Sequence, residues 1–371
     1  MVSTSGANLG SDARNRYVGK HHGNSGGVVT RTAPTGRGAP GDAPAALRVR
    51  DLDVTFSGRR GEVPAVRGVD LDVDAGEVLA LLGESGSGKS VTARAVMGLL
   101  DGPGVHVRAA EVRVAGTDLT RLRPDEVRTL RGETMALVFQ DALSALNPVL
   151  SIGDQLGEVF RIHRGLSRRA ARAEAVELLR LVGIPAPERR IRDYPHQFSG
   201  GMRQRILIAM AVALGPRLLI ADEPTTALDV TVQAQILALV DRLRTELGMG
   251  VLLITHDLGV AAELADRVAV MYAGRIVETG TVTEVLDAPA HPYTAALLRS
   301  VPDLDQPGDR LRPIPGSPPN LLALPSGCAF HPRCDRAGAE CPMVRPERRT
   351  LTAPGRTAAC HYAEEAVDAA V

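Results

Sequence analysis

The segment 83–90, GESGSGKS, constrains this chain more than any other, because it matches the phosphate-binding loop pattern GxxxxGK[ST] in full. The preceding residues 78–82 form an unbroken apolar run, which is typical of a parallel strand buried on both faces. From Lys89 onward, apolar side chains recur at helical spacing. This order of strand, glycine-rich loop and helix predicts an α/β fold.

The same segment is suited to binding nucleotide phosphates. Glycines let the loop curl until its N–H groups point at β- and γ-phosphate oxygens, and the following helix adds its positive dipole end. Lys89 would supply a compact positive charge, and Ser90 a hydroxyl ligand for Mg²⁺. Lys20 and Lys89 are the only lysines among 43 lysine and arginine residues. The chain therefore uses arginine for nearly all of its positive charge but keeps a lysine in this loop, where a compact ammonium group fits phosphates better than a planar guanidinium.

Two acids and a histidine are predicted to reach one edge of the sheet. Residues 218–221 are apolar and lead into Asp222 and Glu223, and residues 251–255 lead into His256. A carboxylate at such a strand end holds Mg²⁺, and its neighbour can act as a base for the attacking water. Since open α/β sheets bind ligands at this edge, we favour a role for His256 at the γ-phosphate over a structural one.

A second anion-binding arrangement comes before a later helical segment. Ser199, Gly200 and Gly201 stand at the start of that segment, where backbone N–H groups are unpaired. The triplet alone is weak evidence. Its position shortly before Asp222 and Glu223 makes it informative.

Two further residues end predicted strands. Phe56 closes the alternating segment 47–56, and its ring could stack on a purine or pack in the core, so both readings stay open. Gln140 follows the apolar segment 135–139.

Taken in order, these motifs make the chain resemble the ATP-binding subunits of ABC transporters over about residues 47–280. The segments FSGGMRQR and HPYTAALL and the cysteine-containing tail resemble the oligopeptide/dipeptide importer branch, and within it the D-type subunit. The resemblance implies a P-loop ABC ATPase domain with a mostly parallel sheet core, an antiparallel β subdomain and a helical insertion. A small cysteine-containing C-terminal extension would follow.

The resemblance also implies roles for residues near the γ-phosphate. Phe56 would stack on adenine, and Gln140 would link Mg²⁺ and the attacking water to a membrane subunit. Glu223 would be the general base and His256 the γ-phosphate sensor. The Mg²⁺ ligands would be Ser90, Gln140 and Asp222.

Other residues would contact nucleotide across a subunit interface. Ser199, Gly200 and Gly201 would act on ATP held by a partner subunit, and Asp229 would lie at that interface. The full nucleotide-binding set would comprise Phe56, Gly83, Glu84, Ser85, Gly86, Ser87, Gly88, Lys89, Ser90, Val91, Ser199, Gly200, Gly201 and Asp229.

The implied function is ATP hydrolysis that powers a membrane importer for oligopeptides or dipeptides. The implied partners are two transmembrane permease subunits and a second ATPase subunit, a distinct F-type homologue that would form a heterodimer. An extracytoplasmic peptide-binding protein would act indirectly, and the chain would sit peripherally on the cytoplasmic face of the inner membrane. Nickel or another small solute is an alternative cargo.

Composition agrees with that location. The formal net charge is zero, so bulk charge does not indicate a nucleic-acid partner. No run of 18 apolar residues is present, and the first residues lack the apolar core of a secretory signal. We therefore expect a cytosolic chain that does not itself cross a membrane.

Two other classes of ATPase share some of these motifs. Chromosome-maintenance or repair ATPases need a long inserted coiled coil, whereas only residues 141–198 separate Gln140 from Ser199 here. A kinase with a phosphate-binding loop would need neither the serine-glycine triplet nor the strand that leads to His256.

The tail contains four cysteines, Cys328, Cys334, Cys341 and Cys360. In a reducing compartment we expect no disulfides, and four thiolates fit either Zn²⁺ or a [4Fe–4S] cluster. The lack of a CxxC pair argues against a zinc ribbon. The family resemblance favours the iron–sulfur cluster, with Zn²⁺ as the alternative metal and free structural thiols as the reading without a metal.

These patterns predict three regions. Residues 1–44 are poor in large apolar side chains and are expected to be a disordered extension. Residues 45–290 would form the ATPase domain, with a helical subdomain at about 141–200. Residues 291–371 would form the C-terminal extension with the cysteine cluster.

Overall fold

The computed structural model describes residues 44–140, 145–226, 228–300, 313–351 and 355–368. The predicted disordered extension, residues 1–44, lies outside the described residues except for Pro44, and residues 141–144 of the predicted helical subdomain also lie outside them.

Strands lie next to each of the motifs that the sequence predicts. Their bounds are β1 Leu47–Gly58, β2 Gly61–Val73, β3 Val78–Leu82, β4 Val105–Arg108, β5 Glu111–Val114, β6 Thr117–Asp118, β7 Met135–Val138, β8 Leu218–Asp222, β9 Gly250–Ile254, β10 Arg267–Tyr272, β11 Arg275–Thr281, β12 Arg349–Thr350 and β13 Thr357–Ala358.

The helices include three short 3₁₀ turns among the described residues. Their bounds are α2 Lys89–Val96, η2 Leu119–Arg121, α3 Pro124–Leu130, α5 Ile152–Arg164, α6 Arg168–Leu181, α7 Pro187–Arg190, η3 Pro195–Gln197, α8 Gly200–Val212, α9 Val230–Leu247, α10 Leu258–Leu264, α11 Val282–Asp287, α12 Pro292–Arg299, η4 His331–Arg333 and α13 Ala363–Asp368.

The strands form two sheets. The larger has the order β12-β13-β11-β10-β3-β9-β8-β7, and its strands from β10 to β7 are parallel. Every residue of β3, β8 and β9 is buried, which explains their continuous apolar sequences. The smaller sheet is antiparallel, with the order β2-β1-β5-β6 and with β4 paired to β1. The predicted α/β class is therefore confirmed.

The parallel sheet carries a hydrophobic core on each face. Because side chains alternate along a strand, Leu79 and Leu81 of β3 pack with the antiparallel sheet and α2. Val78, Ala80 and Leu82 of the same strand pack with the helices on the other face. Strand β3 is thus held from both sides, and the loop that follows it starts from a rigid point.

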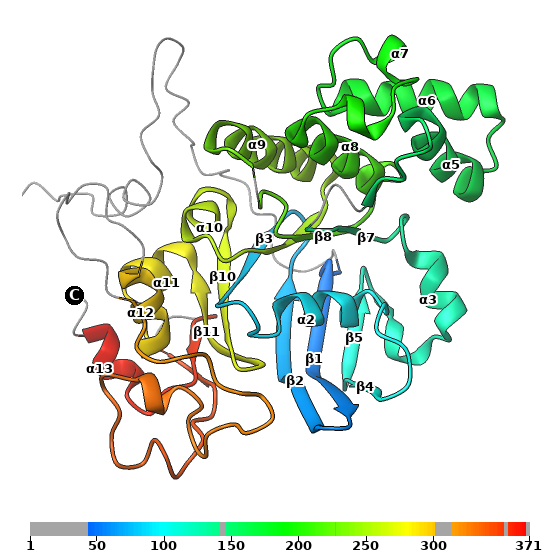
Figure 1. Cartoon of the computed structure of the whole chain (residues 1–371). Coiled ribbons are helices and arrows are strands. Elements are labelled where there is room, and N and C mark those ends of the chain that lie inside the picture. Colours follow the sequence, from blue (N-terminus) through cyan, green and yellow to red (C-terminus); the bar gives the residue numbers. More distant parts are fainter. Residues whose placement is uncertain (1–43, 141–144, 227, 301–312, 352–354, 369–371) are drawn as a thin grey trace, which may run out of the picture.

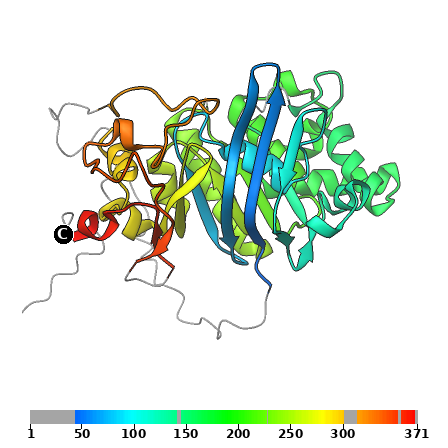
Figure 2. The ribbon, with the colours of Figure 1, turned by 90° about the horizontal axis from the view of Figure 1, so that it is seen from below.

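In the helical insertion, helices α5 and α6 each begin at a serine that caps the helix. Ser151 accepts a hydrogen bond from the N–H of Asp154 at the start of α5, and Ser167 accepts one from Ala170 at the start of α6, as predicted for Ser167. Figure 1 shows α5, α6 and α7 at one end of the molecule, far from α11, α12 and α13. Figure 2 shows the same separation from below.

The segment 112–119 does not form one continuous strand. Strand β5 ends at Val114, the chain turns at Ala115 and Gly116, and β6 begins at Thr117. Both turn residues have positive φ, 46° and 87°, which breaks the extended backbone. Ala273 and Gly274 form the short connection between the antiparallel strands β10 and β11.

The C-terminal extension packs against the ATPase core. Tyr293 of α12 and Phe330 belong to the same buried cluster as β3, β8 and β9. Strand β13 pairs with β11, and the hydroxyls of Thr279 and Thr357 lie 2.7 Å apart in a hydrogen bond. Figure 2 shows this extension along the β11 side of the sheet.

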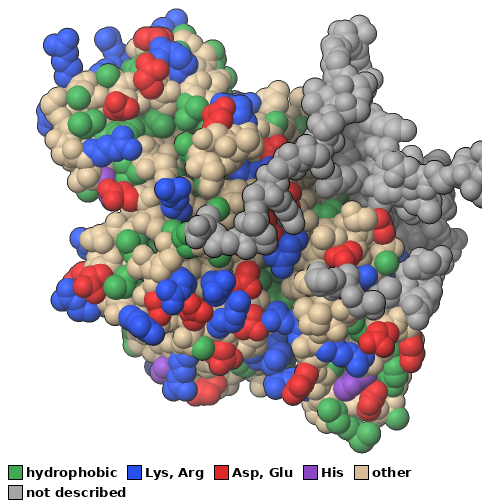
Figure 3. Space-filling model, turned by 180° about the vertical axis from the view of Figure 1, so that it is seen from behind, with side chains coloured by type: hydrophobic (Ala, Val, Ile, Leu, Met, Phe, Trp, Pro, Cys, Tyr) green, Lys and Arg blue, Asp and Glu red, His purple; other side chains and the backbone are tan. Residues whose placement is uncertain are grey.

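Acidic and basic side chains are interspersed over the face in Figure 3, in keeping with 43 residues of each sign. Within the described ranges, no helix combines the length and the apolar character needed to span a bilayer.

Candidate nucleotide site

The strand order brings the predicted motifs to one edge of the parallel sheet. Strands β3, β9, β8 and β7 are neighbours in the sheet (Figure 1). At or just beyond their carboxyl ends lie the phosphate-binding loop, His256, the Asp222–Glu223 pair and Gln140. These segments are far apart in sequence, so only the parallel pairing makes them neighbours.

The phosphate-binding loop is tightly packed. Gly88, which precedes α2, has φ of 111°, and a Cβ there would lie 2.5 Å from the carbonyl oxygen of Ala65. The hydroxyl of Ser87 in the same loop is buried without a hydrogen-bond partner. Buried polar groups normally have partners, so this hydroxyl fits a loop shaped to receive a polar ligand.

Lys89 is buried inside this loop. Its side chain is 6% exposed, and Nζ donates hydrogen bonds to the carbonyl oxygens of Gly83 (2.7 Å) and Glu84 (3.0 Å). Burial lowers the pKa of Lys89, and the negative charges of Glu223, Asp222 and Glu84 oppose that shift. Among the described residues Lys89 forms no ion pair. A buried ammonium held only by carbonyl groups is an incomplete site that an anion would complete.

Ser90 and Asp222 form an oxygen-rich pair beside the loop. The Ser90 hydroxyl donates to Oδ1 of Asp222 at 2.9 Å. Burial raises the pKa of Asp222, and the Ser90 hydrogen bond partly offsets the rise. Hard oxygen donors of this kind fit Mg²⁺, which uses one or two carboxylates together with substrate phosphates.

Glu223 is the point where the other predicted residues meet. Its Oε2 accepts hydrogen bonds from Nε2 of Gln140 (2.8 Å) and from the hydroxyl of Thr226 (2.9 Å). Its Oε1 lies 3.0 Å from Nδ1 of His256. Glu223 has φ of 48°, a strained value for a residue with a side chain, and such strain is concentrated at functional sites. Thr226 was not among the predicted site residues.

Hydrogen bonding also controls the ionisation of Glu223. Burial alone would raise its pKa, but the hydrogen bonds from His256 and Thr226 and the charges of His256 and Lys89 together outweigh burial, so the pKa of Glu223 lies below its usual value. The carboxylate is therefore ionised at neutral pH and able to accept a proton.

Ser199 and Asp229 lie at the exposed starts of two helices. Ser199 caps α8 through the N–H of Met202 (3.4 Å), and Asp229 caps α9 through the N–H of Val232 (3.0 Å). Ser199, Gly200 and Asp229 are exposed. No hydrogen bond joins them to the phosphate-binding loop within the described residues.

Phe56 is half-buried in β1. It pairs with Val63 of β2 and with Val105 of β4, and part of its ring packs on the core between the sheets. The ring is thus anchored in the core while one side stays accessible.

The phosphate-binding loop also contacts the C-terminal extension. The Glu84 carboxylate is ion-paired with Arg333, and the Glu84 N–H donates to the Tyr293 hydroxyl. None of the sequence patterns indicated these contacts, because no local signal links residues 249 positions apart.

The predicted metal centre in the tail is wrong. Among the described residues no group of three or more His, Cys, Asp or Glu side chains could hold a metal ion, and all four cysteines, Cys328, Cys334, Cys341 and Cys360, are free. Neither the [4Fe–4S] cluster nor its Zn²⁺ alternative is therefore supported.

Burial gives the physical reason. Burial raises the pKa of Cys328 and Cys334, and raises that of Cys360 to about 11, so these thiols stay protonated. Cys328 and Cys334 pack on the main core and Cys360 packs with Ala290 and Leu351, while all four cysteines line one small pocket. The cysteines therefore serve as small apolar side chains here.

Two family models match the chain. The model described as "ABC transporter" matches residues 66–226, and "Oligopeptide/dipeptide transporter, C-terminal region" matches residues 277–341. The first range contains the phosphate-binding loop, the Ser199 triplet and the Asp222–Glu223 pair, and the second covers much of the extension.

Curated relatives match nearly from end to end. The dipeptide transport ATP-binding protein DppD of Bacillus subtilis is 49% identical over 325 residues, which are 88% of this chain and 97% of that protein. The oligopeptide transport ATP-binding protein OppD of Escherichia coli is 47% identical over 333 residues, 90% of this chain and 97% of that protein. OppD of Bacillus subtilis is 53% identical over 285 residues, 76% and 80% of the two chains.

A solved structure agrees with the fold. The dimeric ATP-binding cassette MJ0796, in a post-hydrolysis state with ADP and Pi, has a TM-score of 0.56 and 29% identity, and the match covers 64% of this chain and 98% of that one. With the site geometry and the curated relatives, it leads to one conclusion. The chain belongs to the ATP-binding subunits of ABC transporters, a family of ATPases, and within that family to the oligopeptide/dipeptide branch.

Proposed function

We propose that ATP binds with its phosphates in the loop 83–91, and that this chain hydrolyses it to drive import of oligopeptides or dipeptides. The observation that carries the proposal is the buried Lys89 ammonium, which is held only by the carbonyl groups of Gly83 and Glu84. Phosphate oxygens would give this charge a partner, and the unpartnered Ser87 hydroxyl would gain a hydrogen bond.

Glu223 is proposed as the general base. Its ionised carboxylate has His256 on one oxygen and Gln140 on the other, so both residues can hold it toward an attacking water. Ser90, Asp222 and Gln140 are proposed to hold Mg²⁺, which would neutralise charge that develops on the phosphates. The accessible side of Phe56 would stack on adenine.

The site is proposed to be completed by a second ATPase subunit. Ser199 and Gly200 are exposed at the start of α8 and Gly201 next to them is half-buried, and the unpaired N–H groups of this first turn suit a γ-phosphate presented by a partner. Asp229 would lie at the same interface. The dimeric state of the MJ0796 cassette supports this arrangement, and a distinct F-type homologue is the proposed partner.

Exposed apolar residues support docking to membrane subunits. Phe139, which adjoins Gln140 in sequence, and Val149 both lie between β7 and α5 and are 46% and 76% exposed. Large exposed apolar side chains commonly mark contact sites. We propose that two permease subunits dock here and hold the chain peripherally at the cytoplasmic face of the inner membrane. A peptide-binding protein would act on those subunits from the other side.

The three regions expected from the sequence stay part of the proposal. Residues 45–290 would form the ATPase domain with the helical subdomain at about 141–200, and residues 291–371 the extension. Tyr293 and Phe330 of the extension pack into the core of the ATPase domain, which supports a fixed arrangement of these two regions.

The experiment measures ATP hydrolysis and assembly in a Glu223→Gln variant. We expect the rate to fall by at least about 10²-fold, since a positioned base contributes about 10²–10⁴-fold. ATP should then trap the closed complex with the second subunit, measured by light scattering. Glu246→Gln, on the exposed face of α9, is the control. A Glu223→Gln protein that turned over ATP at the wild-type rate would remove the assignment.

The transport step needs a separate test. A tagged chain purified from its own membranes should carry two multi-spanning subunits and a second ATPase, with hydrolysis stimulated by peptide-loaded binding protein. Purification without membrane subunits would contradict the transport role.

A further inference from the structure

Glu84 of the phosphate-binding loop has all of its polar groups engaged. Its N–H donates to the Tyr293 hydroxyl at 2.8 Å, its carbonyl accepts from Lys89 at 3.0 Å, and its carboxylate accepts from Arg333. Two of these three partners come from the C-terminal extension. The loop is therefore held from outside as well as by its own lysine.

Arg333 makes the stronger of the two outside contacts. Its Nη1 and Nη2 donate to the two carboxylate oxygens of Glu84 at 2.7 and 3.0 Å, the forked geometry that gives arginine–carboxylate pairs both strength and direction. The residue is 8% exposed, so solvent screens this pair little.

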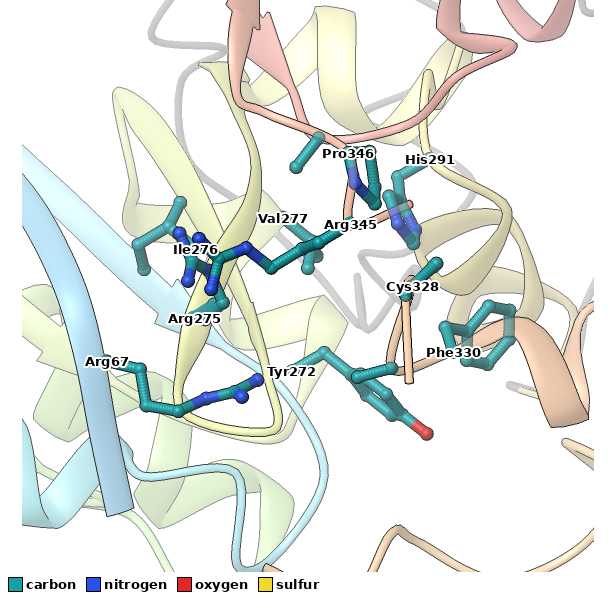
Figure 4. A pocket seen from close by; sticks show the side chains of 13 residues that line it. Arg67, Tyr272, Arg275, Ile276, Val277, His291, Cys328, Phe330, Arg345 and Pro346 are labelled. Carbon is teal, nitrogen blue, oxygen red and sulfur yellow. The ribbon is translucent and has the colours of Figure 1, made fainter. Parts of the chain in front are cut away.

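Arg333 is itself fixed by its surroundings. Its Nε donates to the carbonyl oxygen of Pro315 at 2.8 Å, and Nη1 lies 3.4 Å from the Tyr272 hydroxyl. The guanidinium also lies near the rings of Tyr272 and Phe330. In Figure 4 these two rings lie together, with the Tyr272 hydroxyl directed away from the neighbouring Arg67, and the rings are edge to face at 5.3 Å.

Tyr293 is equally fixed. It is fully buried, and its ring packs against Tyr272 at 4.5 Å and against Phe330 at 5.3 Å. Tyr272 ends β10, the strand next to β3. The extension thus reaches the loop through a rigid aromatic cluster anchored on the sheet.

The arrangement has a consequence for ligand binding. Lys89 uses two of its three ammonium N–H donors on the carbonyls of Gly83 and Glu84, so the third can meet a phosphate oxygen while the loop keeps its present shape. With Glu84 also held by Arg333 and Tyr293, the loop backbone has that shape before a nucleotide arrives. Without them, binding would have to include ordering of the loop.

We propose that Arg333 and Tyr293 are positioning residues for the phosphate-binding loop, so that ATP affinity depends on the C-terminal extension. This rests on the proposed function, in which that loop binds ATP. The two residues touch Glu84, not the nucleotide, and act by keeping the loop in its binding shape.

The test compares Arg333→Ala, Arg333→Lys and Tyr293→Phe with the wild-type chain in ATP titrations and steady-state hydrolysis. For Arg333→Ala we expect Kd and KM for ATP to rise about tenfold, or about 1.4 kcal/mol, with kcat changed much less. Arg333→Lys keeps the charge but loses the fork, so its effect should be smaller. Hydrogen exchange of residues 83–88 should become faster in Arg333→Ala and Tyr293→Phe.

The matched control is Arg348→Ala. Arg348 belongs to the same extension and pairs with Asp70 of β2 at 2.6 Å, away from the loop. It should alter stability without changing KM or exchange of residues 83–88. Adding Glu84→Gln to Arg333→Ala should cost little more than Arg333→Ala alone, because the two residues act as one pair.

The outcomes separate two failures. If Lys89→Ala bound ATP as well as the wild-type chain, the proposed function would be wrong. If Lys89→Ala lost ATP binding while the Arg333 and Tyr293 variants kept wild-type KM and exchange, the positioning role alone would be wrong. Should Arg333→Ala not fold, Arg333→Lys and Tyr293→Phe decide the question by the same measurements.

Discussion

The Ser90 hydroxyl donates a hydrogen bond of 2.9 Å to Oδ1 of Asp222, although 132 residues separate them in the chain. The bond joins the first turn of α2 to the end of β8. It places side by side the two oxygen-bearing side chains that we propose as Mg²⁺ ligands.

Ser90→Ala is therefore expected to weaken use of Mg²⁺. The Mg²⁺ concentration for half-maximal ATP hydrolysis should rise about tenfold or more, in line with the loss of an oriented ligand. A Mg²⁺ titration at fixed ATP measures this. Thr129→Ala on the exposed helix α3 is the control, and an unchanged half-saturating concentration in Ser90→Ala would contradict the role.

His256→Ala is expected to move the pH dependence of hydrolysis. The hydrogen bond from His256 holds the pKa of Glu223 down against burial, so removing it raises that pKa. The base is then protonated at a higher pH, and the acidic limb of the rate profile shifts upward. Thr226→Val should shift the limb in the same direction by less. If residual activity in both variants kept the wild-type limb, Glu223 would not be the titrating base.

Gly88→Ala and Gly86→Ala form a matched pair in the loop. Both glycines have positive φ, but only at Gly88 would a Cβ meet backbone, 2.5 Å from the oxygen of Ala65, whereas at Gly86 nothing lies within 4 Å. Gly86→Ala should cost about 1–2 kcal/mol of unfolding free energy from backbone strain alone. Gly88→Ala should cost more, by about 1–3 kcal/mol from the added overlap. Equal losses in urea unfolding would show that the close approach is unimportant.

His291→Asn is expected to reduce acid sensitivity. Burial lowers the pKa of His291 to about 4, below its unfolded value of 6.5, so the unfolded chain binds the extra proton first. This contribution to stability is complete above pH 6.5 and is lost as pH falls toward 4, up to about 3 kcal/mol. Asparagine can still cap α12, as His291 does through Nδ1, but cannot titrate.

The neighbouring Glu278 provides the contrast. Burial raises its pKa to about 7, so its contribution is present below pH 4.5 and is lost as pH rises toward 7. Because the two contributions oppose each other, the free energy of unfolding of His291→Asn should increase relative to that of the wild-type chain as pH falls from 7 to 4. A difference between the two chains that stays constant over this range would exclude His291 as a source of acid sensitivity.

The parts of the site on buried strands were predictable from sequence. The strand at 78–82 has the predicted bounds because a parallel strand covered on both faces needs a continuous apolar run, and such a run has sharp ends. Asp222, Glu223 and His256 reach one sheet edge for the same reason. Local patterns were sufficient here because each strand carries its own signal.

Contacts made by pairing of distant residues were not predictable. Arg333 and Glu84 meet only because α12 and the aromatic rings of Tyr272, Tyr293 and Phe330 bring the extension onto the sheet, and no periodicity encodes that docking. The cysteines led to a wrong prediction because their spacing in the sequence was informative but their surroundings in the fold were not visible in it. Clustering in sequence suggested a shared metal, and the four cysteines do line one pocket, but burial keeps three of the thiols protonated.

The short strand β13 covers the outer side of β11, the last long strand on that side of the parallel sheet. An uncovered β11 would offer a row of free N–H and C=O groups to any other extended chain. Strand β13 therefore protects this edge of the sheet from pairing with another molecule. A protein cut off before residue 349 would be expected to lose solubility even with an intact nucleotide site.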